Sequence, residues 1–321
     1  MNIFKHREAL LALAILASLG LIASRFPAFI QPASLANVFN DSAPLMILVI
    51  GQVIVILTKC IDLSVAANLA LTGMIAALMN GAGVPLPLIL AAVVVIGAAL
   101  GAVNGVLVWK VGIPSIVVTL GTMTIYRGII FLLTDGKWVN AHEMTDGFKA
   151  LPRLAILGLP VMSWVAVVLI AVFALVLTRT ALGRAFYAVG GNPHAAVYAG
   201  LNVGRTQFWA FVISGALAGV TGYLWVARYA VAYVDIAGGF ELDVVAACVI
   251  GGIAIAGGAG TIWGAVLGAL FLGVIKNALP VVDISPFWQM AISGSAIILA
   301  VAFNTAKSRP KGRLILREAT E

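Results

Sequence analysis

The residue types that usually carry enzymatic chemistry are sparse in this chain and lie apart from one another. His6, His142 and His194 show no ligand-type spacing, and no serine occupies a nucleophile elbow. Cys60 and Cys248 lie in or beside apolar segments without the spacing of a metal or disulfide pair, so we expect two small core residues. The sequence therefore predicts no catalytic site, no metal site and no bound cofactor.

Uncharged polar side chains recur inside apolar stretches, where they are costly unless they face a cavity or a partner. Such amide and hydroxyl groups suit hydrogen bonding to a hydroxylated solute, and hydrogen bonds between helices explain them equally well. For the charged Arg127 and Lys276, snorkelling or a misplaced segment boundary is favoured over solute contact. The residues that we assign to a candidate polar path are Gln52, Asn68, Asn104, Thr119 and Thr122.

One polar segment, residues 179–206, interrupts the apolar sequence and contains no acidic residue. It carries Arg179, Arg184 and Arg205, a helix-forming stretch, a Gly-Gly-Asn-Pro break and a second short amphipathic stretch. Because basic residues collect on the cytoplasmic side of membrane proteins, we expect a cytoplasmic docking loop for a soluble partner.

The composition sets the class of protein that must hold these residues. Of 321 residues, 62% are hydrophobic and only 10% are charged, which excludes an ordinary water-soluble globule. The net charge of +7 does not indicate nucleic-acid binding, because the basic residues lie at the ends of apolar segments rather than on one face with aromatics. We expect an all-α, polytopic membrane protein forming one transmembrane domain over residues 1–321.

Segments of about 20 apolar residues are the length that a helix needs to cross a bilayer. Two of the expected spans, 43–58 and 242–256, are short, and short spans indicate helices that break or fail to cross fully. The apolar run that follows Lys5 and Arg7 is interpreted as a retained first helix rather than a cleaved signal peptide. The sequence predicts about ten spans, at 9–24, 43–58, 64–80, 88–109, 113–134, 161–178, 207–227, 242–256, 261–279 and 287–305.

The distribution of charge orients these spans. With the N-terminus inside, most basic residues fall on the cytoplasmic side and most acidic residues on the opposite side. Both termini are therefore expected in the cytoplasm. The cytoplasmic set is Lys5, Arg7, Lys59, Lys110, Arg179, Arg184, Arg205, Lys307, Arg309, Lys311, Arg313 and Arg317.

A weak internal repeat predicts two halves of opposite orientation. Asp62–Ala67 echoes Leu242–Ala247, and Gly97–Ala102 echoes Gly264–Ala269, in the same order. With the expected topology the paired segments run in opposite directions, as in transporters with inverted repeats. The four-residue spacing of glycines in the second pair also predicts close helix packing at these positions.

Several motifs together resemble the ribose-type permeases of bacterial ABC sugar importers, nearly from end to end. They are Cys60–Ala66 (Cys-Ile-Asp-Leu-Ser-Val-Ala), Ile113–Thr122, Thr180–Pro193 and Gly239–Gly252. Within that family, Thr119–Gly128 and Asp135–Trp138 look most like the rhamnose and autoinducer-2 branch. Cys60 and Ala66 stand where the family often has glycines, which puts a backbone role for those glycines in doubt here.

The resemblance implies a transport subunit of the inner membrane that passes a sugar or sugar-like solute to the cytoplasm. Its implied partners are ATP-binding subunits that hydrolyse ATP, a periplasmic solute-binding protein, a second permease subunit in a homo- or heterodimer, and membrane lipid. The loop at 179–206 would supply short helices that couple to the ATPase. The matching residues are Leu182, Gly183, Arg184, Tyr187, Gly190, Asn192, Pro193, Ala195, Ala196 and Gly200.

Two other functions stay open at this stage. An ion-coupled secondary transporter of a small polar solute would need a carboxylate near the bilayer centre, for which Asp62 and Asp243 are the candidates. A non-transporting scaffold or receptor would need neither inverted halves nor polar groups along its helices.

Overall fold

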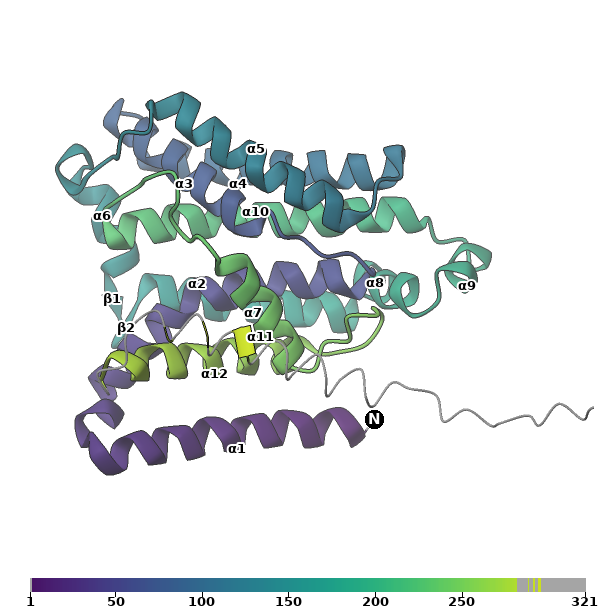
Figure 1. The fold of residues 1–321 in the computed structure, drawn as a ribbon, viewed down its shortest axis with the longest axis horizontal. Coiled ribbons are helices and arrows are strands. Elements are labelled where there is room, and N and C mark those ends of the chain that lie inside the picture. The colour runs from purple at the N-terminus through teal and green to yellow at the C-terminus, as the bar shows by residue number, and fades with distance from the viewer. Residues whose placement is uncertain (1, 282–287, 289–290, 292–293, 296–321) are drawn as a thin grey trace, which may run out of the picture.

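The computed structural model describes residues 2–281, 288, 291 and 294–295, and this part of the chain is almost entirely helical (Figure 1). Two short strands, β1 (Ala155–Ile156) and β2 (Leu159–Pro160), pair antiparallel. The 3-10 turns are η1 (Pro27–Ile30) and η3 (Ala141–Glu143), and η2 (Leu107–Val111) is a π-helical turn. The helices are α1 (Asn2–Arg25), α2 (Pro32–Leu57), α3 (Val65–Gly81), α4 (Leu86–Val106), α5 (Ser115–Thr134), α6 (Asp146–Arg153), α7 (Val161–Arg179), α8 (Ala181–Gly191), α9 (Pro193–Tyr198), α10 (Val203–Tyr229), α11 (Phe240–Ile250) and α12 (Ile262–Val281).

Seven helices of the described chain are long and apolar enough to cross a membrane, which confirms a polytopic membrane protein. They are α1, α2, α4 with η2, α5, α7, α10 and α12, whereas α3 and α11 have only 17 and 11 residues. Nine of the expected spans correspond to these helices. The tenth, 287–305, lies outside the described residues with the basic C-terminal tail, so the total of ten stays a prediction.

The expectation of a short span at 43–58 is wrong, because α2 begins at Pro32 and has 26 residues. Its polar residues do not end the helix, since Asn40 meets Ser163 and Asp41 pairs with Arg228 inside the protein. The other short span is confirmed: α11 ends at Ile250, before a glycine-rich turn at 251–260.

Helices α2 and α10 lie antiparallel at the centre of the fold. Gln207 at the start of α10 donates to the Thr58 carbonyl after α2, at 3.1 Å, and Arg228 at the end of α10 pairs with Asp41 in α2. Each of the two is followed by a short helix, α3 or α11, and then by a longer one, α4 or α12. The two halves therefore run in opposite directions, as the repeat predicts.

In each half, the second and third helices pack against the first helix of the other half. Helices α3 and α4 pack against α10, and helices α11 and α12 pack against α2. We call these sets the α10 bundle (α10, α3, α4) and the α2 bundle (α2, α11, α12). The chain crosses between bundles at 58–64 and again at 230–239. We name the ends of the molecule after the elements there: α8 and α9 mark the α8 end, and α6 with the strands marks the α6 end (Figure 1).

The glycines expected at packing seams lie where helix backbones meet. A methyl group placed on Gly101 of α4 would lie 2.1 Å from the carbonyl oxygen of Phe211 in α10, and one on Gly97 would lie 2.3 Å from that of Gly215. In α12, a methyl group on Gly268 would approach the Ala247 carbonyl oxygen of α11, and one on Gly264 would approach that of Gly251 directly after α11, at 2.2 Å in each case. Small residues thus allow the backbone contact that packs each bundle, where lipid supplies no hydrophobic drive.

This packing predicts opposite effects for two glycine substitutions. Gly101→Ala forces α4 away from α10 and is expected to lower the free energy of unfolding by about 1–3 kcal/mol, as overpacking does. Gly121→Ala in α5, where nothing lies within 4 Å, is expected to be neutral or to stabilise by up to about 1 kcal/mol, because alanine favours helix. Equilibrium unfolding in mixed detergent micelles measures both, and equal tolerance of the two changes would contradict the seam.

Candidate functional site

The polar segment at 179–206 folds into two short helices, each started by a side-chain cap. Thr180 accepts from the Gly183 amide before α8, and Asn192 accepts from the Ala195 amide before α9. Pro193 stands at the first position of α9, so the Gly-Gly-Asn-Pro break ends one helix and starts the next. After α9, Gly200 adopts φ +80°, and the Leu201 amide bonds the Ala196 carbonyl at 2.9 Å in a Schellman-type stop.

The predicted coupling residues divide between two faces of this segment. Leu182, Arg184, Asn192, Ala195 and Gly200 are exposed, and Tyr187 and Pro193 are half-buried. Gly183, Gly190 and Ala196 are buried, because they pack the segment onto the bundle. A direct contact between these three and a partner is therefore ruled out in this conformation.

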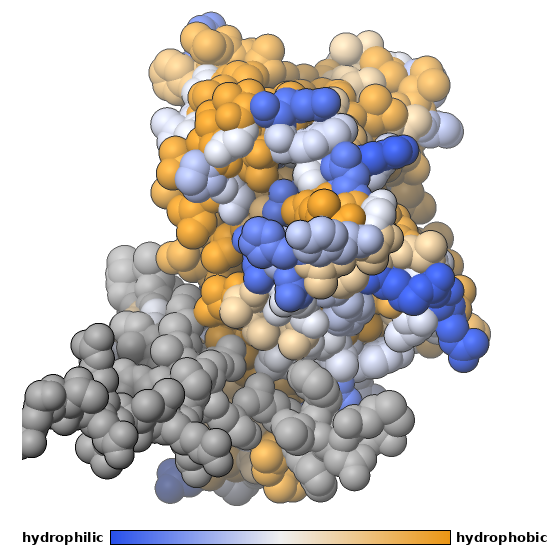
Figure 2. Space-filling view, turned by 90° about the vertical axis from the view of Figure 1, so that its right-hand side faces the viewer, coloured by the Kyte–Doolittle hydropathy of each residue, from blue (hydrophilic) through white to orange (hydrophobic). Residues whose placement is uncertain are grey.

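Two exposed apolar side chains of α9 were missed by the sequence analysis. Val197 is 58% exposed and Tyr198 is 94% exposed, beyond the membrane-spanning helices. With Leu182 and Arg184 they form what we call the α8–α9 surface. Figure 2 looks onto this end of the molecule and shows hydrophilic residues across the middle with hydrophobic residues on the flanks.

The inner face of α8 rests on the end of α2 and on the 251–260 turn, and α8 also packs against α10. A methyl group on Gly190 would lie 1.6 Å from the Leu57 carbonyl oxygen at the end of α2. The same carbonyl accepts from the Gly258 amide at 3.0 Å. Tyr187 donates its hydroxyl to the Gly260 carbonyl at 3.0 Å, and burial raises the pKa of this phenol, which keeps it a donor at neutral pH. We call this three-way contact the α8 junction.

The Ile-Asp-Leu-Ser-Val motif lies in the crossover loop next to the α8 junction. Asp62 is only 2% exposed and accepts from the Ser64 amide at 3.0 Å and from the Ser64 hydroxyl at 2.6 Å. Its other oxygen accepts from the Ser214 hydroxyl of α10 at 3.0 Å. Asn104 of α4 donates to the Ser64 oxygen at 2.8 Å. The loop at 58–64, which we call the motif loop, is thus bonded into the α10 bundle.

Helix α5 also holds the motif loop. Ser115 accepts from the Ile61 amide at 3.2 Å, and Thr119 donates to the Ile61 carbonyl at 3.3 Å. Both polar groups of one peptide segment are therefore satisfied by side chains, as a buried backbone requires.

The five residues assigned to a polar path are all buried within the chain, with exposures of 0 to 4%. Asn68 donates to the Gly97 carbonyl and Asn104 to Ser64, so both join helices to one another. Thr119 and Thr122 bond backbone carbonyls of their own helix. Gln52 has no hydrogen-bond partner among the described residues, and the side-chain oxygens of Asn68 and Asn104 have none there either.

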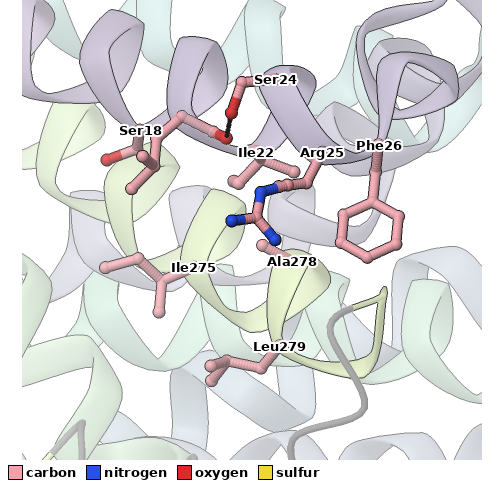
Figure 3. A pocket seen from close by; sticks show the side chains of 9 residues that line it. Ser18, Ile22, Ser24, Arg25, Phe26, Ile275, Ala278 and Leu279 are labelled. Atoms are coloured by element: carbon pink, nitrogen blue, oxygen red, sulfur yellow. Dashed lines mark hydrogen bonds between the residues drawn. The ribbon is translucent and has the colours of Figure 1, made fainter.

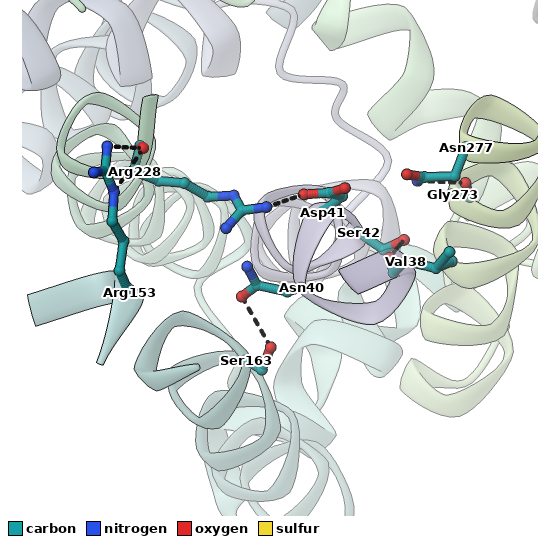
Figure 4. A network of polar contacts seen from close by, with 9 residues as sticks. All are labelled: Val38, Asn40, Asp41, Ser42, Arg153, Ser163, Arg228, Gly273 and Asn277. Carbon is teal, nitrogen blue, oxygen red and sulfur yellow. Dashed lines mark hydrogen bonds and ion pairs between the residues drawn. The ribbon is translucent and has the colours of Figure 1, made fainter. Parts of the chain in front are cut away.

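Ion pairs and arginine contacts close the α6 end. Arg228 pairs with Asp41, and Arg153 donates to the Arg228 carbonyl at 3.1 Å (Figure 4). Arg127 donates to the Val234 and Ile236 carbonyls, at 2.6 and 2.8 Å, and so holds the crossover at 230–239.

The charged residues inside the spans find partners within the chain. Lys276 of α12 forms an ion pair with Asp243 of α11. Arg127 donates to the backbone of the 230–239 crossover. Among the described residues there is no group of three or more histidine, cysteine, aspartate or glutamate side chains able to hold a metal ion. Cys60 and Cys248 are buried and free, as expected of core residues.

Residues 34–301 match the family described as "Branched-chain amino acid transport system / permease component". The ribose import permease protein RbsC of Haemophilus influenzae is 35% identical over 298 residues, which cover 92% of this chain and 92% of that protein. The autoinducer 2 import system permease protein LsrC of Enterobacter sp. strain 638 is 37% identical over 299 residues, covering 92% of this chain and 86% of that protein. The LsrC protein of Salmonella typhi is 35% identical over 299 residues, 93% of this chain and 86% of that protein.

No solved structure matches the chain. The family match and the near full-length similarity agree with the membrane-spanning fold. The chain belongs to the permease-component family of membrane transport systems.

Proposed function

We propose that this chain is the membrane-spanning subunit of an ATP-driven importer that passes a sugar or sugar-like solute from a periplasmic binding protein to the cytoplasm. The similar permeases bear the names of ribose and autoinducer 2 import systems, which supports a small hydroxylated solute. The chain belongs to a permease family rather than a catalytic one, so ATP hydrolysis falls to a separate ATP-binding subunit.

The observation that carries this proposal is the α8–α9 surface. Tyr198 and Val197 of α9 and Arg184 of α8 are exposed, on a segment without acidic residues and outside the membrane-spanning helices. Tyrosine and arginine are among the residues that most often anchor protein interfaces. We infer that the ATP-binding subunit docks here and that its acidic groups face Arg184.

Movement of the docked subunit would reach the bundles through the α8 junction. Gly190 rests on the end of α2 and Tyr187 on the 251–260 turn before α12, so a displacement of α8 pushes the α2 bundle as a unit. The α2 bundle then moves against the α10 bundle, into which the motif loop is bonded. A difference in nucleotide affinity between the two arrangements is what lets ATP select one of them.

The orientation in the bacterial inner membrane follows from this docking. The α8 end carries Lys59, Lys110 and Arg205, and Thr261 at the same end bonds Glu8 near the N-terminus of α1. We therefore assign the α8 end and both termini to the cytoplasm. The α6 end then faces the periplasm and receives the binding protein.

A second permease subunit, identical or related, completes the assembly and encloses the path. Within each chain we assign the path to the polar group around the motif loop, Asn68, Asn104 and Thr119, together with Gln52 and Thr122. The unpaired carbonyl oxygens of Asn68 and Asn104 support this assignment, because a buried acceptor without a partner is costly and suits a hydroxylated solute. These side chains become accessible when the bundles separate.

The ion-coupled alternative is less well supported. It needs a carboxylate that binds and releases a cation, whereas Asp62 is bonded by two serines and Asp243 is paired with Lys276. Uptake by the isolated chain in liposomes, driven by an ion gradient without ATP, would favour the alternative.

Docking predicts that truncation of the α8–α9 surface weakens the complex without unfolding the chain. Tyr198→Ala is expected to cost about 2 kcal/mol of binding, roughly a 30-fold rise in Kd for the ATP-binding subunit. Arg184→Ala is expected to lower ATP-driven uptake while membrane insertion stays normal. Leu157→Ala is the matched control for co-purification with the ATP-binding subunit, because Leu157 is 88% exposed at the opposite end. Co-purification and uptake in proteoliposomes measure these effects, and normal coupling in both α8–α9 variants would contradict the docking site.

The α8 junction predicts a contrast between two neighbouring glycines. Gly190→Ala places a methyl group against the Leu57 carbonyl and is expected to reduce ATP-driven uptake at least tenfold, because a 1 Å misplacement of a coupled element is costly. Gly191→Ala meets nothing within 4 Å and is expected to transport normally. Both variants keep the α8–α9 surface, so binding of the ATP-binding subunit should persist. Equal uptake by the two variants would show that α8 is not seated as described.

A further inference from the structure

A hollow of about 560 Å³ opens between α1 and α12 near the α6 end. Its wall is largely apolar, with Leu21 and Ile22 on α1 and with Ile275, Ala278 and Leu279 on α12 (Figure 3). None of the α1 span from Glu8 to Arg25 is buried by the described residues, as expected of a helix that faces lipid. The volume falls in the range of sites that enclose a small ligand.

Arg25 gives the hollow a positive charge at one edge. It is the last residue of the α1 span and therefore lies at the level of lipid headgroups. Figure 3 shows its guanidinium group directed over the gap between α1 and α12, near Ala278. Among the described residues it has no acidic partner within salt-bridge distance.

A second hollow of about 410 Å³ adjoins the first at this level. Arg25 and Phe26 line both, and Ala28 and Ser34 line the second. The break between α1 and α2, where η1 follows Phe26, forms this second space. An apolar space inside the bilayer thus continues into a space at the interface, with one cation where they meet.

We propose that these two hollows bind an anionic phospholipid. The acyl chain lies in the apolar hollow between α1 and α12, the phosphate meets Arg25, and the remaining headgroup extends toward the second hollow. The positive charge of Arg25 favours a phospholipid over an uncharged lipid, because a guanidinium group can form two hydrogen bonds with phosphate oxygens. Basic pockets between transmembrane helices recognise anionic headgroups by this chemistry. Since α1 packs mainly against α12, the lipid would fill the contact that joins the first helix to the fold.

Native mass spectrometry of the purified full-length chain in detergent tests this proposal. The protein is titrated with phosphatidylglycerol, with zwitterionic phosphatidylcholine of the same acyl chains, and with inorganic phosphate. We expect phosphatidylglycerol to bind most tightly, and Arg25→Gln to weaken it by about fivefold, the effect of one basic residue on an anionic lipid. Lys137→Gln removes an exposed cation from the α6 end without touching either hollow, and should leave the affinity unchanged.

A second variant tests the apolar hollow separately. Ala278→Trp fills the space between α1 and α12 and is expected to reduce binding of both phospholipids, with folding checked by size-exclusion chromatography. Three results would overturn the proposal. They are unchanged phosphatidylglycerol affinity in Arg25→Gln, equal binding of inorganic phosphate alone, and absence of any retained lipid on the wild-type chain, as expected if another part of the chain fills the hollow.

Discussion

The carbonyl oxygen of Leu57, at the end of α2, is the contact on which the rest of this structure depends. It accepts a hydrogen bond from Gly258 in the turn before α12, and it lies so close to Gly190 that α8 can rest there only without a side chain. One backbone atom therefore joins α8 to the end of α2 and to the turn before α12. A rigid contact of this kind transmits displacement, because closely packed backbones cannot be compressed.

The exchange of helices between halves explains why the motif loop is so heavily bonded. The chain leaves the α2 bundle at 58–64 and returns to it at 230–239, so these two crossovers connect the bodies that we propose to move against each other. Asp62, Ser64 and Asn104 hold the first crossover at the α8 end, and Arg127 holds the second at the α6 end. Hydrogen bonds at low dielectric keep each crossover in one geometry. In the movement that we propose, α2 and α10 shift at their interface, where Gly51 approaches Ser214.

Much of this architecture could be predicted from single residues and their spacing. Asn192 and Pro193 marked the boundary between α8 and α9, because side-chain capping and proline geometry are local. The glycines at 97 and 101 marked a packing seam, although nothing local told that its partner is α10. The bond that Asp62 accepts from Ser214 was not predictable, since Ser214 lies 152 residues away.

Which side chains of α8 and α9 are buried and which are exposed could not be predicted from the sequence either. Helix α9 has six residues, too few for a hydrophobic periodicity to separate buried Ala196 from exposed Tyr198. The expected span began only at 43, after the polar residues at 40 and 41, because their partners Ser163 and Arg228 come from distant helices. At this position a long-range contact outweighed a local preference.

The central claim is that α8 and the α2 bundle move as one body against the α10 bundle. Pulsed electron paramagnetic resonance on the complete transporter measures this directly, with spin labels at exposed positions of the α8 end. We predict that the distance between labels at Ala188 in α8 and Ala256 in the 251–260 turn is the same with and without bound ATP. The distance between Ala256 and Val111, which follows α4, should change. A constant Ala256–Val111 distance together with a shifted Ala188–Ala256 distance would contradict the account.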